Sequence, residues 1–269
     1  MATQKINTQP AQACSGCRGS GWLVKTQDGV ESVVPCPDCR SQARLQQLLK
    51  KAAIPPRYFD RGFKEYDLLT RTQERAHMRA SKYVEDFPDV PHGLLFAGTC
   101  GVGKTHLSVA ILKTLIQEKM VAGKFIDEVG FLRRLQYSYS QGSSETEREV
   151  MLPLSEIDLL VWDDLGTGRP TEWVKETIRT VINHRYTHKK HTILSTNLLL
   201  EPESTKLSQS RTLAKKVPVN LAESIGMPLY SRIMEMCEIV QIDGPDYRTD
   251  IDKAGKVFRQ KTQEDDSKS

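Results

Sequence analysis

The sequence contains no hydrophobic run that approaches the roughly 20 residues needed to cross a bilayer. Its first 13 residues, MATQKINTQPAQA, also lack the apolar segment of a secretory signal. These absences predict a cytoplasmic protein with no membrane partner. The formal net charge is only +4, so the composition permits contact with nucleic acid without arguing strongly for it.

Internal repeats are also absent, and the six histidines show no paired spacing typical of metal ligands. What remains is an ordinary globular composition, with 38% hydrophobic and 27% charged residues. A chain of 269 residues is long enough for one large domain and a small one beside it.

Four of the six cysteines form two CxxC pairs. The first is Cys14 and Cys17 in CSGC, and the second is Cys36 and Cys39 in CPDC. Because disulfides are rare in the cytoplasm, four closely paired cysteines are better interpreted as metal ligands. A filled tetrahedron of thiolates suits structural Zn²⁺ and leaves no open catalytic position. The alternative is a set of free thiols.

From residue 92 onward, short apolar segments alternate with amphipathic ones. This alternation predicts an α/β fold with a parallel sheet covered by helices on both faces. The expected strands are GLLFAG, GKFIDE, DLLVWDD, HTILSTN and EIVQID. We expect helices at 39–54 and 71–87, a polar loop at 201–220, and helical structure in LAESIGMPLYSRIMEMC.

These patterns divide the chain into four parts. The division predicts a disordered N-terminus (1–13), a zinc module with a linker helix (14–53), an ATPase domain (54–250) and a flexible tail (251–269).

The strongest functional pattern is GTCGVGKTH, which fits GxxxxGK[ST] between a strand and a helix. Its glycines allow backbone N–H groups to point inward at phosphate, and the helix dipole adds attraction. We expect Lys104 to reach the β- and γ-phosphates of ATP and Thr105 to give a hydroxyl to Mg²⁺. The alternative is a glycine-rich turn without a ligand. The predicted nucleotide-binding residues are Gly98, Thr99, Cys100, Gly101, Val102, Gly103, Lys104, Thr105 and His106.

Polar residues follow two of the later strands. Asp163 is expected to hold Mg²⁺ through water, and Asp164 to polarise the attacking water. Asn197 ends ILSTN, where an amide could orient that water or contact the γ-phosphate. In isolation, an Asp pair is usually part of a turn or a helix cap, and a terminal Asn is also an ordinary turn residue.

Two arginine-containing segments could also serve the function. Arg232 in LYSRIMEM could neutralise charge on the γ-phosphoryl group, although an arginine on an amphipathic helix is ordinarily just solvated. The segment FLRRLQYSY interleaves aromatic rings with Arg133 and Arg134, which suits single-stranded nucleic acid. The alternative there is a helix with an apolar core face.

Taken in order, these motifs resemble the AAA+ helicase loaders of the DnaC/DnaI type and the related IstB-type ATPases. The resemblance covers roughly residues 50 to 250 and rests on AAIPPRYFDRGF, LLFAGTCGVGKTHLSVAI, DLLVWDDLG, TILSTN and LYSRIMEM. It implies an AAA+ P-loop fold, with Gly98 to Thr105 as Walker A. Asp163 and Asp164 would be the Walker B carboxylates and Asn197 sensor 1.

The resemblance also implies roles for two arginines. Arg232 would be an arginine finger that acts on the ATP of a neighbouring subunit, and Arg248 would be sensor 2. Two departures stand out. Many AAA+ proteins end Walker B with Asp-Glu where this chain has Asp-Asp, and the segment 201–220 looks longer than the usual link. The Asp-Asp pair, usual in the loader group, fits a slow ATPase.

The leading hypothesis is an ATPase that loads a replicative helicase hexamer onto single-stranded DNA, self-associating when ATP is bound. The zinc module would then be the docking end, since one copy precedes an ATPase and no J-domain sequence accompanies it. One alternative is an IstB-like ATPase that assists a transposase on duplex DNA. Another is a nucleotide-gated adaptor that binds only protein.

Overall fold

The computed structural model describes residues 14–251, apart from 15, 19, 21, 28–29, 141 and 201–219. The predicted disordered N-terminus, nearly all of the predicted loop 201–220 and nearly all of the predicted tail therefore lie outside the described residues. Within the described part, no helix is both long and apolar enough to span a membrane.

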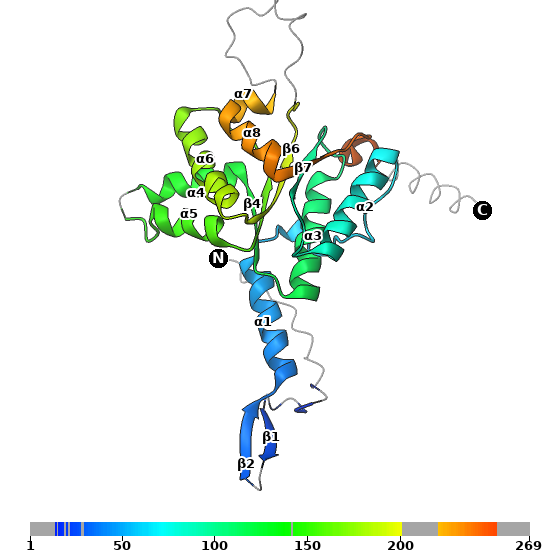
Figure 1. Ribbon diagram of the computed structural model, residues 1–269, viewed down its shortest axis with the longest axis vertical. Coiled ribbons are helices and arrows are strands. Elements are labelled where there is room, and N and C mark those ends of the chain that lie inside the picture. Colours follow the sequence, from blue (N-terminus) through cyan, green and yellow to red (C-terminus); the bar gives the residue numbers. More distant parts are fainter. Residues whose placement is uncertain are drawn as a thin grey trace, which may run out of the picture.

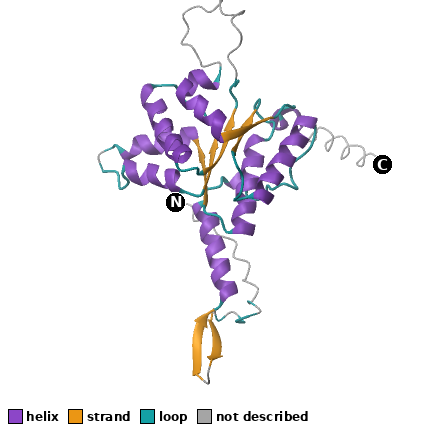
Figure 2. Ribbon diagram, viewed as in Figure 1, coloured by secondary structure: helices purple, strands orange, loops and turns teal. Residues whose placement is uncertain are grey.

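A five-stranded parallel sheet forms the centre of the molecule (Figure 1), in the order β4-β5-β6-β3-β7. Helices cover both of its faces (Figure 2), so the predicted α/β architecture is confirmed. The strands are β3 (Gly93–Ala97), β4 (Gly123–Asp127), β5 (Leu159–Asp163), β6 (His191–Thr196) and β7 (Cys237–Gln241).

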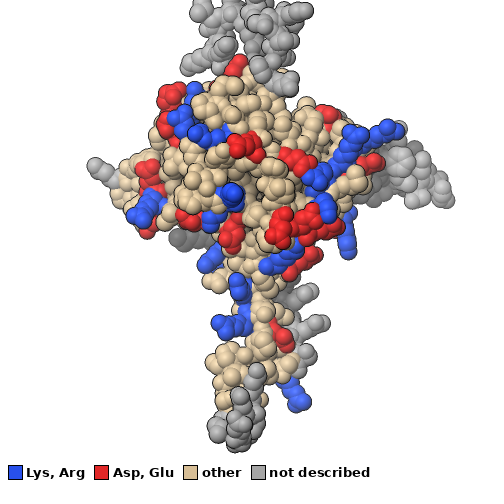
Figure 3. Space-filling view, in the orientation of Figure 1, with Lys and Arg blue, Asp and Glu red and all other residues tan. Residues whose placement is uncertain are grey.

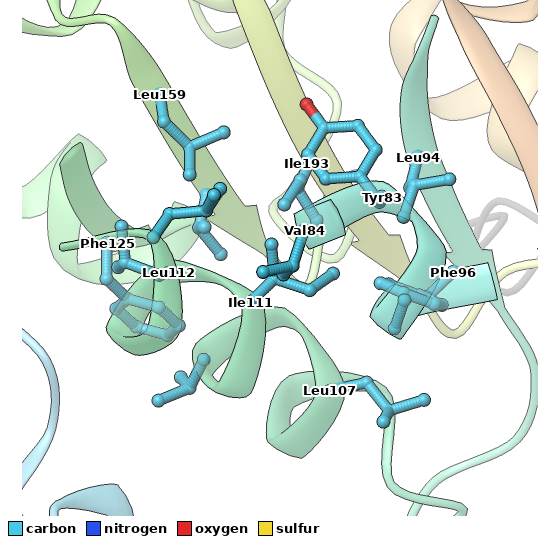
Figure 4. Packing of buried hydrophobic residues seen from close by; sticks show 14 of the residues in the cluster. Tyr83, Val84, Leu94, Phe96, Leu107, Ile111, Leu112, Phe125, Leu159 and Ile193 are labelled. Carbon is cyan, nitrogen blue, oxygen red and sulfur yellow. The ribbon is translucent and has the colours of Figure 1, made fainter. Parts of the chain in front are cut away.

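Two apolar clusters fill the space between the sheet and the helices. Successive strand residues point to opposite faces, so Leu94 and Phe96 enter one cluster and Leu95 the other. The first cluster packs the sheet on α2 (Arg71–Asp86) and α3 (Lys104–Lys119), as Figure 4 shows. The second packs it on α4 (Glu128–Ser138), α5 (Glu147–Glu156), α6 (Glu172–Thr187), α7 (Leu221–Ile225) and α8 (Met227–Met236).

The structure divides the predicted helical segment LAESIGMPLYSRIMEMC into two helices. Gly226 separates α7 from α8, because its φ of +88° lies outside the helical region. Pro228 then occupies the first turn of α8, where its missing N–H costs nothing.

The N-terminal module contains a hairpin that the sequence analysis missed. Strands β1 (Trp22–Gln27) and β2 (Val30–Pro35) pair antiparallel between the two CxxC pairs. Helix α1 (Pro37–Lys51) follows and carries the hairpin away from the sheet (Figure 1). A 3₁₀ turn (Pro56–Tyr58) and an irregular connector with turns lead on to α2.

The end of α1 is fixed to the edge of the sheet. Leu45, Leu48 and Leu49 pack against the first apolar cluster. The carbonyl of Ala52 accepts a hydrogen bond from the N–H of Phe125 on β4, at 2.7 Å. The module is therefore held to the ATPase core by packing and by backbone pairing.

Arg185 on α6 is fully buried, and its guanidinium ties several elements together. It donates to the carbonyls of Leu154 and Ile157, at 2.8 and 2.9 Å, and to the carbonyl of His191 at 2.5 Å. Its Nε also donates to Thr192 Oγ1 at 3.0 Å. One side chain thus satisfies the carbonyls at the end of α5 and the start of β6.

We expect Arg185→Met to lower the free energy of unfolding by about 2–4 kcal/mol, because the buried carbonyls remain and lose their donors. Removing a buried charge would by itself be favourable, but the unsatisfied carbonyls outweigh that gain. The matched control is Arg179→Met on the same helix, where the guanidinium forms a partly exposed ion pair with Glu176. Urea denaturation measures both, and equal effects would contradict this account.

Candidate functional site

The phosphate loop joins the end of β3 to the start of α3. Gly101 and Gly103 adopt φ values of +78° and +101°, which favour glycine. A Cβ on Gly101 would lie 1.8 Å from Asp246 Oδ1, and one on Gly103 would lie 2.4 Å from the ring of Tyr66. The positive φ values and the close contacts with Asp246 and Tyr66 therefore exclude any side chain at these two positions.

Lys104 is the first residue of α3, and only 5% of its surface is exposed. Its ammonium donates to the carbonyls of Gly98 and Thr99, at 2.9 and 2.6 Å, and to Asn197 Oδ1 at 2.6 Å. Burial lowers the pKa of Lys104, because a desolvated ammonium is disfavoured. The charge is thus held by neutral oxygens that a phosphate group could replace.

Thr105 and Asp163 meet directly below the loop. The Thr105 hydroxyl donates to both carboxylate oxygens of Asp163, at 3.0 and 2.8 Å. The hydroxyl of Ser195 donates to the same carboxylate at 2.5 Å. Burial raises the pKa of Asp163 to about 6, and the charge of Asp164 adds to the rise. A hydroxyl and a carboxylate side by side are oxygen ligands of the kind Mg²⁺ prefers, so these residues fit that ion.

Asp164 and Asn197 complete this polar cluster. Asn197 Nδ2 donates to Asp164 Oδ1 at 2.7 Å, and the Asp164 N–H donates to Ser195 Oγ at 3.0 Å. Asp164 has a φ of +56°, an uncommon backbone conformation for this residue type. Lys104, Asn197 and Asp164 therefore form one hydrogen-bonded line across the site.

A cavity opens over the phosphate loop, and much of its wall was not foreseen. The Tyr66 hydroxyl and the Gln73 amide both donate to the carbonyl of Val102, at 3.1 and 3.2 Å. The connector before α2 therefore braces the loop. In the sequence, the only signal for this bracing is the segment AAIPPRYFDRGF, one of the stretches on which the family resemblance rests. The cavity wall that the sequence analysis missed comprises Arg57, Tyr58, Arg61, Glu65, Tyr66, Asp67, Gln73 and Tyr247.

The two predicted arginines lie in different places. Arg248, in the π-helical turn Tyr247–Ile251, lines the same cavity as Lys104. Arg232, on α8, is half-exposed. It is not among the described residues that line this cavity. Its guanidinium lies 3.5 Å from the carbonyl of Pro228 on its own helix. A role for Arg232 at the site of the same subunit therefore has no geometric support.

The four paired cysteines come together at the base of the hairpin. Their sulfur atoms all lie within 4.8 Å of one another. The Sγ–Sγ distance is 3.7 Å from Cys14 to Cys36 and 3.4 Å from Cys17 to Cys39. A hydrogen bond with Cys17 is the main reason that the pKa of Cys39 rises to about 12. Four thiols this close together do not all lose their protons unless a cation balances the negative charge of the thiolates. Four cysteine sulfurs are a donor set that fits Zn²⁺.

The segment FLRRLQYSY, in and just after α4, has both a core side and an exposed side. Phe131 is buried against Trp162, with ring centroids 5.3 Å apart, and so belongs to the core. Arg134 forms an ion pair with Glu145. Arg133 is exposed, and Tyr137 exposes 71% of its surface. Arg133 and Tyr137 are therefore available on the surface to contact a partner.

Comparison with known proteins agrees with this geometry. The family model described as IstB-like ATP binding protein matches residues 26–254. The replicative helicase loader DnaC of Escherichia coli (strain K12) is 28% identical over 172 residues, which cover 63% of this chain and 68% of that protein. The phage-like element PBSX protein XkdC of Bacillus subtilis (strain 168) is 26% identical over 247 residues, covering 87% of this chain and 84% of that protein.

A crystal structure of the DnaC helicase loader has the same fold as this chain. Its TM-score is 0.58 at 32% sequence identity, and the match covers 70% of this chain and all of that one. The expected resemblance to AAA+ loaders of the DnaC type is confirmed.

We expect purified protein to contain about one zinc ion per chain, because a closed thiolate site contributes directly to folding. Metal analysis measures this occupancy. The Cys100→Ser variant should retain the ion and a Cys36→Ser variant should lose it. Folded wild-type protein with less than about a tenth of an equivalent would contradict the assignment.

We expect Asp163→Asn to stabilise the nucleotide-free protein at pH 7.5, by on the order of 1–3 kcal/mol. Because burial raises the carboxyl pKa from 3.8 to about 6, the folded state holds a proton more tightly than the unfolded state. Stability therefore falls as pH rises between these values, and the penalty is complete above them.

Thermal unfolding at pH 4 and pH 7.5 measures this effect, and the advantage of the variant should disappear at the lower pH. With ATP and Mg²⁺ the order should reverse, since only the wild type keeps the carboxylate. A variant less stable than wild type at pH 7.5 without nucleotide would refute the argument.

Proposed function

The chain belongs to the IstB-like ATP-binding protein family, and on that premise we propose that it hydrolyses ATP to load a replicative helicase hexamer onto single-stranded DNA. The observation that carries the proposal is the line of Lys104, Asn197 and Asp164 across the cavity. It joins a phosphate-binding cation to a carboxylate through a polar amide. The named loaders among the relatives support the choice of partner.

The proposed chemistry assigns one task to each side chain. Lys104 exchanges its carbonyl partners for the β- and γ-phosphates. Thr105 and Asp163 would hold Mg²⁺, and the ion would neutralise charge on the phosphates. Asp164 and Asn197 orient and polarise the attacking water, and Arg248 faces the nucleotide from the cavity wall. The short Asp164 carboxylate suits slow hydrolysis, in which ATP serves mainly as an assembly switch.

Arg232 is proposed to act on the ATP of a neighbouring subunit. Its half-exposed position on α8, outside the cavity of its own chain, suits contact with another copy. A guanidinium supplied in this way would stabilise charge in the transition state. Hydrolysis would then depend on self-association through the ATPase domain when ATP is bound.

The zinc module is proposed to dock on the helicase. One face of its hairpin exposes Trp22, Val24 and Val33, at 55%, 64% and 65% of their surfaces. An apolar face of this kind, on a small arm, marks an interaction surface. Exposed basic side chains lie along α1, between this face and the ATPase core (Figure 3), so the complementary partner surface is apolar with acidic residues near it. They are Arg40, Arg44, Lys50 and Lys51.

Single-stranded DNA is proposed to contact the exposed part of α4. Arg133 supplies charge for the backbone, and the Tyr137 ring supplies a stacking surface. Arg134 is engaged by Glu145, so Arg133 carries the proposed contact.

We expect two sets of substitutions to separate the two contacts. Changing Trp22, Val24 and Val33 together to Ser should weaken helicase binding by at least about tenfold while ATP-dependent DNA binding persists. Arg133→Ala should do the reverse, and the control is Arg75→Ala, an exposed arginine on α2. Substitution is preferable to deletion here, because deletion into α1 would strip leucines from the core.

Helicase capture and fluorescence anisotropy with single-stranded and duplex DNA measure these effects across salt concentrations. A hairpin variant that still loads helicase would refute the docking role. Preference for duplex DNA without helicase capture would favour the transposase-associated alternative. Binding to neither DNA would favour a protein adaptor.

A further inference from the structure

Glu128 is a buried carboxylate that the proposed chemistry does not use. Only 1% of its surface is exposed, although it is the first residue of α4 and its neighbour Asp127 is exposed. Its two oxygens accept hydrogen bonds from the backbone N–H groups of Gly166 and Gly168, at 2.6 and 2.7 Å. Burial raises the pKa of Glu128, so the fold bears a cost for placing a carboxylate here.

The two glycines belong to the loop that directly follows Asp163 and Asp164. A Cβ on Gly168 would lie 2.7 Å from Glu128 Oε1, so the carboxylate and the loop fit closely. The loop is also held on its other side, because Ser224 Oγ donates to the carbonyl of Gly166 at 2.7 Å. Movement of this loop would therefore pull directly on the first turn of α4.

The same loop begins at the nucleotide site. Lys104 donates to Asn197, and Asn197 donates to Asp164, two residues before Gly166. When Lys104 turns to bound phosphates, Asn197 loses this partner, and the line of hydrogen bonds must rearrange. A continuous path thus runs from the phosphate loop through Asn197, Asp164 and the loop glycines to Glu128.

We infer that Glu128 is a positioning residue that couples the occupancy of the nucleotide cavity to the placement of helix α4. Through it, ATP sets the orientation of Arg133 and Tyr137 on the exposed side of α4. The second statement rests on the proposed function, whereas the coupling itself does not require that DNA be the partner of α4.

Hydrogen exchange of the α4 amides in the full-length protein, with and without ATP and Mg²⁺, tests the coupling. The wild type should show a nucleotide-dependent change in exchange across residues 128–138. Glu128→Gln keeps the side-chain volume but places an N–H₂ group against one backbone N–H. Gly168→Ala disturbs the same contact from the loop side, through its added Cβ.

Both variants should bind ATP within about threefold of wild type, and their nucleotide-dependent exchange change should shrink at least about fivefold. Asp127→Asn is the matched control, because it removes a neighbouring carboxylate that only caps α4 through Gly130. It should behave as wild type. Thermal unfolding identifies any variant that fails to fold, and the other variant then decides.

The possible outcomes are distinct. An unchanged α4 response in both folded variants, or no response in the wild type, overturns the inference. A response that the variants lose, in a protein that binds no single-stranded DNA with ATP, supports the coupling and overturns the DNA contact. Loss of both the response and the ATP-dependence of DNA binding supports both.

Discussion

A positive charge buried inside a backbone loop is the constraint on which the rest of the site depends. Lys104 is desolvated, so each of its protons needs an oxygen nearby. Two of these oxygens are carbonyls of the loop itself, and the third comes from Asn197 at the end of β6. The sheet order places β6 directly beside β3, and this adjacency brings the amide within reach. β5 lies on the other side of β6, and its end brings Asp163 and Asp164 to the same edge of the sheet.

The features that could be predicted from the sequence are those that depend on residues close together along the chain. The phosphate loop, the apolar strand ending in Asp163 and the Cys pairs each depend on spacing within a few residues. The parallel sheet follows from the alternation of strands and helices. The positions of Lys104, Thr105, Asp164 and Asn197 around one cavity then follow from the shared edge where parallel strands end.

The parts that escaped prediction depend on contacts between distant segments. Nothing periodic marks Glu128, whose partners lie 38 and 40 residues away. The ion pair of Arg134 with Glu145 is equally invisible in a motif of arginines and tyrosines. The hairpin between the Cys pairs exposes its apolar residues, and so lacks the one-sided pattern of a core strand. The break at Gly226 requires a backbone angle that the flanking helical pattern conceals.

The docking of α1 on the edge of the sheet has a consequence for the direction in which the hairpin faces. The helix has 15 residues and spans about 22 Å at a rise of 1.5 Å per residue. Its last turn is fixed by the leucines and by the bond from Phe125 to Ala52. Each residue of an α-helix also turns the chain by about 100°. The number of residues in α1 therefore sets the rotation of the Trp22 face about the helix axis, relative to the nucleotide cavity. One residue more or fewer would leave the zinc module intact but aim that face about a quarter of a turn away.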